Sequence, residues 1–238
     1  MENNDTILEG HSDLEKGAYL GAIASLATAD REASEEEIEY IEQLCDAAQL
    51  SQKQKEFVVR AATELTGEDL KKCLDVLKNS ELKYSLVTDL IAFGKSDQNY
   101  SPEEQENVQK IATYLGVEQK QFSLLDQFAE KASTEATPEE IQKPSFLSST
   151  GLKDKLQSAG INPQSLLKGL IGIAGPMLLA GMLSGGMRRR SGMGGFGGLG
   201  GSILGGGGGL GSIIGMLSGG RGIGSTGGLL GRMFGNRF

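Results

Sequence analysis

The chain has 238 residues and a formal net charge of −8, but its two parts differ strongly in composition. Residues 1–143 carry 14 Lys or Arg against 30 Asp or Glu, whereas residues 144–238 carry nine Lys or Arg, a single acid and 30 of the 36 glycines. Because so acidic a head repels phosphate, the composition excludes nucleic acid as a partner.

The chain opens with a polar N-terminal tail over residues 1–12, which has no apolar segment of the kind found in signal peptides. We therefore expect the protein to stay in the cytoplasm. Residues 13–132 then show seven segments with apolar residues at helical spacing and no convincing strand. The first of these, from Leu14 to about Ala29, has a face of small residues that allows close helix contact. We expect a compact all-α bundle.

Six further helices follow in this region, each opened by a capping signal. We expect them to begin near Ser34, Ser51, Thr66 or Gly67, Asn79 or Ser80, Ser101 and Glu118. The strongest signal is Ser101 with Pro102 and Glu104, which supplies a cap, a proline at the first helical position and a carboxylate at the third. On these features alone, we expect residues 1–143 to fold as an independent helical unit.

Residues 133–160 are polar over much of their length and include two prolines, so they are interpreted as a linker. Asn162 and Pro163 then start an apolar helical segment over residues 161–190. Its uncharged part, residues 169–187, is long enough to cross a bilayer but contains six glycines and a proline. Three arginines follow it, and residues 191–238 form a low-complexity tail of glycine with Leu, Ile, Met and Phe. We expect residues 161–238 to contact a membrane or a membrane protein, and the chain to be able to form a homo-oligomer.

One acidic loop pattern occurs twice in the head. Asp30 is followed four residues later by Ser34 and seven residues later by Glu37, and Asp97 is followed in the same way by Ser101 and Glu104. Each pattern comes after an apolar helix and at the start of an amphipathic one. This spacing predicts two copies of one helix–loop–helix unit, in which Asp97 of the second copy corresponds to Asp30 of the first.

Helix capping explains the serine and the glutamate of each copy, since the serine accepts a backbone N–H and the glutamate reaches back to the cap. It does not explain the aspartates, which either hold their loops through backbone bonds or act as hard oxygen ligands. If the copies pack about a pseudo-twofold axis, the four carboxylates converge. We therefore predict a site for a divalent cation of unidentified kind formed by Asp30, Glu37, Asp97 and Glu104. Asp89 lies on an apolar helix face. We expect its carboxylate either to hydrogen-bond to the ligands of this site or to bond two helices together.

No enzyme active site is evident. The only histidine is His11, and Cys45 and Cys73 fall on apolar helix faces, where reduced core thiols are expected. The glycine runs follow no strand, which argues against a phosphate-binding loop.

Residues 13–132 resemble the TerB tellurite-resistance family. The stretch Leu20–Asp30 with Ser34–Glu37 is similar to the family's Asp–Ser–Glu signature, and the stretch Leu86–Glu104 is similar to its second copy. Arg31 and Gln98 stand where the family has glycine after each aspartate. The resemblance implies a seven-helix bundle, a role in metal binding, membrane partners in stress-response systems and no catalysis.

Two functions are therefore considered. The first is a non-enzymatic, cation-binding, stress-response adaptor held at the cytoplasmic face of a membrane by its tail. The alternative is a structural protein that self-assembles through its glycine-rich apolar tail, with the helical head as a docking module.

Overall fold

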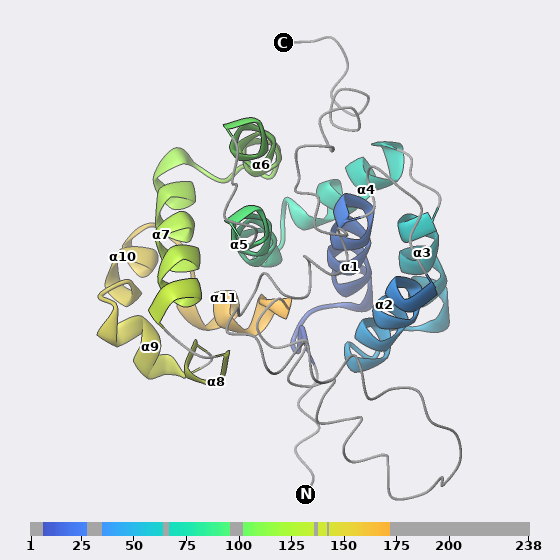
Figure 1. Ribbon diagram of the computed structural model, residues 1–238, viewed down its shortest axis with the longest axis horizontal. Coiled ribbons are helices and arrows are strands. Elements are labelled where there is room, and N and C mark those ends of the chain that lie inside the picture. Colours follow the sequence, from blue (N-terminus) through green and yellow to red (C-terminus); the bar gives the residue numbers. More distant parts are fainter. Residues whose placement is uncertain are drawn as a thin grey trace, which may run out of the picture.

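The computed structural model describes residues 7–27, 35–63, 67–95, 102–135, 138–141 and 143–171 (Figure 1). Within these ranges the chain is helical and has no strand, which confirms the predicted all-α fold class. The seven predicted helices are α1 (Asp13–Ala27), α2 (Glu35–Ala47), α3 (Gln52–Thr63), α4 (Gly67–Leu77), α5 (Leu82–Gly94), α6 (Pro102–Tyr114) and α7 (Gln119–Glu135). Four shorter helices follow, α8 (Pro138–Ile141), α9 (Pro144–Ser149), α10 (Lys153–Ser158) and α11 (Pro163–Gly169).

Helices α1 and α5 lie at the centre of the bundle (Figure 1). Helix α1 packs mainly on α3 and α4, and α5 packs on α6, α7 and α11. The two central helices also contact each other, so one continuous core runs through both groups.

The small-residue face of α1 explains its close packing. A Cβ atom at Gly21 would lie only 2.9 Å from the Phe57 ring and 3.2 Å from the Cys73 sulfur, so these two side chains occupy the space that glycine leaves free. Ala18 and Ala22 on the same helix are buried. Leu14 departs from the expected inward face, because its side chain is 55% exposed.

The N-terminal region differs from the expected polar tail. Ile7 and Leu8 are buried in the core, because two adjacent apolar side chains find a surface to cover there. Ser12 then caps α1, with its hydroxyl donating to Glu15 Oε2 at 2.7 Å and its backbone N–H donating to the same oxygen at 2.9 Å. These bonds, together with one from Ser80, lower the pKa of Glu15 to about 2.

The predicted repeat is present in the helix boundaries. Four helix boundaries of the first unit have a counterpart in the second unit. The two members of each pair are as far apart in sequence as Asp30 and Asp97 are. The repeated unit therefore contains three helices rather than two. The matched pairs are the ends of α1 and α5 (Ala27, Gly94), the starts of α2 and α6 (Glu35, Pro102), their ends (Ala47, Tyr114) and the starts of α3 and α7 (Gln52, Gln119).

The turns after α2 and α6 repeat as well. Gln49 and Gly116 both have positive φ angles, of 54° and 75°. One residue further on, the N–H of Leu50 donates to Cys45 O at 3.0 Å, and the N–H of Val117 donates to Ala112 O at 2.9 Å. These are the same helix-ending turn at equivalent positions, so the two units share their local backbone geometry.

The expected linker, residues 133–160, is instead largely helical and packed against the head. Helix α7 continues to Glu135, and α8, α9 and α10 follow. The prolines that suggested a linker, Pro138 and Pro144, are the first residues of α8 and α9, where the missing N–H has no intrahelical partner to lose. The helices are also too short for apolar periodicity to reveal them.

The last described helices complete the core. Phe146 packs edge-on against Phe128, with ring centroids 5.9 Å apart. Asn162 caps α11 as predicted, with its side chain accepting from the N–H groups of Gln164 and Ser165. Ser85 on α5 donates to Leu166 O at 3.1 Å. The apolar segment expected over residues 161–190 therefore starts as a short helix buried against α5.

Residues 144–171 are expected to be needed for full stability. A chain ending at Lys143 loses the buried side chains of Leu147, Leu156 and Leu166, and burial of one such side chain contributes about 1.5–3 kcal/mol. We expect its thermal midpoint, followed by circular dichroism, to lie at least about 5 °C below that of a chain ending at Ile171. The chain ending at Ile171 should match the full-length protein. Equal midpoints for the chains ending at Lys143 and Ile171 would restore the linker interpretation.

Candidate functional site

The structure does not describe the side chains of the four residues predicted to bind a cation. Asp30 and Asp97 belong to the undescribed segments that join α1 to α2 and α5 to α6. Glu37 and Glu104 are the third residues of α2 and α6, and their side chains are likewise outside the description. The structure confirms that both helices begin directly after the predicted caps. The convergence of the carboxylates remains a prediction.

Two polar side chains that the sequence analysis missed occupy equivalent positions next to these loops. Tyr40 and Asn107 are separated by the offset of the repeat, and each lies three residues after the glutamate of its loop. Tyr40 Oη and Asn107 Nδ2 are both buried without a hydrogen-bond partner. Burial also raises the pKa of the Tyr40 hydroxyl. An alignment of the two copies on Asp30 and Asp97 would have shown that Tyr40 and Asn107 occupy equivalent positions.

An unsatisfied buried donor costs about 1–3 kcal/mol, so native proteins keep few of them. Asn107 Nδ2 is a hydrogen-bond donor and Tyr40 Oη can donate as well, so each could bond to a carboxylate oxygen. On a helix, residues three apart share a face. Tyr40 and Asn107 therefore lie on the same helix face as the glutamate one turn before each of them.

Among the described residues, no three or more His, Cys, Asp or Glu side chains gather into a group that could hold a metal ion. Cys45 and Cys73 are free, buried thiols, as predicted. Burial raises the pKa of each thiol to about 12, so neither forms a reactive thiolate at neutral pH.

A comparison with known families matches residues 16–127 to the family model described as "Tellurite resistance protein TerB". The matched segment contains both acidic loops of the repeat and agrees with the predicted resemblance. Residues 16–127 are a TerB domain. No curated protein and no solved structure matches the chain.

A buried carboxylate in α5 ties the TerB domain to the chain that follows it. Asp89 is fully buried, and its Oδ2 accepts a hydrogen bond from Tyr19 Oη of α1 at 2.6 Å. The same oxygen accepts the backbone N–H of Ile171, beyond α11, at 3.2 Å. Burial first, and then the charge of Asp89, raise the pKa of Tyr19 well above its ordinary value. Asp89 is therefore a helix-packing residue, one of the two roles expected for it.

Replacing Tyr19 by Phe is expected to destabilise the protein by about 1.5–3 kcal/mol, the usual contribution of a hydrogen bond to a charged group. Thermal or urea unfolding measures this loss. The matched control is Tyr40→Phe, which also removes one buried hydroxyl, but one without a partner. We expect this control to leave stability unchanged or slightly raised in chelator. Equal losses of unfolding free energy in the two variants would mean that the hydrogen bond from Tyr19 to Asp89 does not contribute to stability.

Proposed function

We propose that this protein is a non-enzymatic stress-response adaptor. Its TerB domain binds a divalent cation between two repeated loops, and its tail holds it at the cytoplasmic face of a membrane. The proposal rests on the match of residues 16–127 to the TerB family model. This tellurite-resistance family is not known for catalysis. The observation that carries the cation site is the pair of unpartnered buried donors, Tyr40 and Asn107, at equivalent positions of the repeat.

In this proposal Asp30, Glu37, Asp97 and Glu104 are the ligands. Four gathered carboxylates repel one another, and a hard divalent ion relieves that repulsion. Tyr40 and Asn107 each donate to the glutamate one turn earlier in their helix, fixing the direction in which it presents its oxygens. Groups behind the ligands commonly tune metal sites in this way. The equal helix spacing of the two units supports a symmetric arrangement of the loops.

We predict that a divalent cation raises the thermal midpoint of the full-length protein relative to chelator. A cation at about 100 times its dissociation constant stabilises the folded state by about 2.7 kcal/mol. Calcium, magnesium, manganese and zinc are compared by thermal shift. The double variant Asp30→Asn/Asp97→Asn should lose the shift, and Tyr40→Phe should reduce it without lowering the midpoint in chelator.

The matched control for this test is Glu39→Gln/Glu106→Gln. These two glutamates also occupy equivalent positions of the repeat, lie on α2 and α6 and are exposed, so the same charge is removed away from the loops. The control should keep the full shift. An equal shift in Asp30→Asn/Asp97→Asn, or none in the unmodified protein, would leave helix capping as the whole explanation of the repeated pattern.

The membrane part of the proposal concerns residues beyond Ile171. None of the helices in the described part of the chain combines the length and apolar character needed to cross a bilayer. Residues 169–171, the first of the uncharged stretch 169–187, are buried against the head. Only residues 172–187 then remain before Arg188, and this stretch is shorter than the about 20 residues that a spanning helix needs. A peripheral attachment, with the arginines on anionic headgroups, fits this length better than a single span.

We predict that the full-length protein floats with vesicles containing anionic lipid in a density gradient, whereas a chain ending at Ile171 does not. Replacing Arg188, Arg189 and Arg190 by alanine should weaken flotation, as should added salt. Recovery of the full-length protein in large, detergent-resistant particles that ignore vesicles would instead support the alternative function, self-assembly through the glycine-rich tail.

A further inference from the structure

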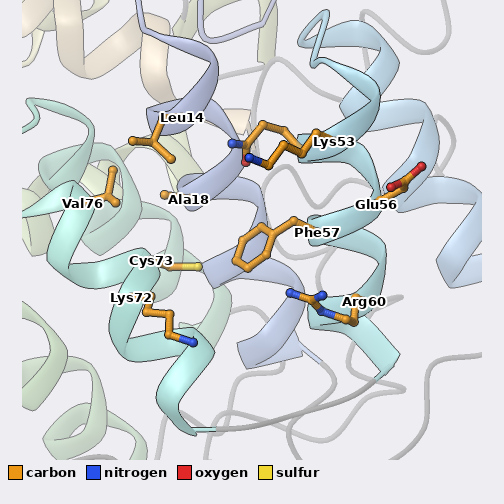
Figure 2. Close-up of a pocket in the computed structure, with 10 residues that line it drawn as sticks. Leu14, Ala18, Lys53, Glu56, Phe57, Arg60, Lys72, Cys73 and Val76 are labelled. Carbon is orange, nitrogen blue, oxygen red and sulfur yellow. The ribbon is translucent and has the colours of Figure 1, made fainter.

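An open groove of about 540 Å³ crosses the head at α1, α3 and α4. Helices α3 and α4 each pack on α1 but make little contact with each other, so a strip of α1 forms the floor between two helical walls. Figure 2 shows the Phe57 ring facing Cys73 across this groove, with Leu14 and Val76 at one end. The residues that line the groove come from α1, α3 and α4, whereas the proposed cation ligands Glu37 and Glu104 belong to α2 and α6.

The apolar part of the groove is incompletely covered. Leu14 is 55% exposed, which makes it the most exposed large apolar side chain among the described residues. Phe57 and Val76 are only partly buried. Leu14 and Ala18 are four residues apart on α1, as are Lys53 and Phe57 on α3, so each helix presents one continuous face to the groove.

The charge of the groove is opposite to that of the head around it. Lys53, Arg60 and Lys72 line it against a single acid, Glu56, whereas residues 1–143 as a whole carry 30 acidic against 14 basic residues. Lys72 is paired with Asp69 at 3.1 Å. Arg60 lies over the Phe57 ring, 5.7 Å from its centroid, and neither Arg60 nor Lys53 forms an ion pair within the described residues. A cationic rim around an apolar floor is therefore available to an anionic ligand.

We propose that this groove binds an amphipathic α-helix of a partner protein, one with an apolar stripe flanked by Asp and Glu. Two helical walls over a helical floor form the kind of surface into which a further helix packs, with apolar side chains at i, i+3, i+4 and i+7 entering the groove. The acidic flanks meet Lys53 and Arg60 on one wall and Lys72 on the other. Charge complementarity of this kind selects the partner and speeds its association.

Segments of this same chain fit the groove poorly. Residues 172–238 carry six arginines and no acid, so the cationic rim repels them. Helix α2 is acidic, but its apolar residues Ile41, Leu44 and Cys45 are buried in its own core. A second folded copy therefore offers no acidic helix with a free apolar face among its described elements.

The test selects ligands for the full-length protein from a displayed library of random peptides about four helical turns long. We expect enriched peptides to be acidic, with apolar residues at helical spacing. Binding of a selected peptide, followed by fluorescence anisotropy, should weaken at least about tenfold, or 1.4 kcal/mol, in Lys53→Glu/Arg60→Glu. Leu14→Ser should weaken it separately, and added salt should weaken it in the unmodified protein.

The matched control is Lys120→Glu/Lys155→Glu, which reverses two exposed lysines on α7 and α10. It should bind the peptide as the unmodified protein does, and thermal unfolding checks that every variant is folded. Enrichment of basic or non-periodic peptides would overturn the proposal, as would equal weakening by the control. A third result would also overturn the proposal: no peptide is enriched, while the protein binds oleate and Lys53→Glu/Arg60→Glu abolishes that binding. The groove would then be a site for an anionic amphiphile. The cation titration is unaffected by any of these outcomes.

Discussion

The buried carboxylate of Asp89 is the constraint on which the arrangement of this protein depends. Its Oδ2 receives a hydrogen bond from α1, at one end of the TerB domain, and another from the backbone of Ile171, well beyond the end of the matched segment at residue 127. A buried charge is tolerated only where hydrogen bonds compensate for lost hydration. Both contacts help to offset the burial of this carboxylate, and they connect α1, α5 and the final described residue.

This connection shapes how the head and the tail relate. Ile171 is the last described residue, and its backbone N–H is bound by Asp89 of α5. The last described residue is thus bound to α5, the helix that leads into the second acidic loop. In the proposed function, the second cation loop and the residue that precedes the membrane-attached tail are therefore both joined to α5.

Much of the head could be predicted from the sequence, because capping residues and apolar periodicity are local signals. Helices α2 and α6 begin directly after Ser34 and Ser101 as predicted, and the offset between the two acidic loops recurs at every matched helix boundary. The short helices after Glu135 were missed because their prolines sit where a linker and a helix start look alike. The role of Asp89 could not be decided from local pattern, since Tyr19 lies 70 residues away and Ile171 lies 82 residues away. Tyr40 and Asn107 were missed because an unpartnered donor is visible only once its surroundings are packed.

Native-state hydrogen exchange tests most directly the claim that Asp89 holds α1, α5 and the segment through Ile171 as one cooperative unit. If Asp89 acts in this way, the amides of Ile171 and α11 in the full-length protein exchange with the same opening free energy as those of α5. In that case Asp89→Asn also lowers the opening free energy of α1 and of the segment through Ile171. Rapid exchange of Ile171 and α11 while α5 stays protected would contradict the claim, and would return residues 144–171 to the status of a loosely attached linker.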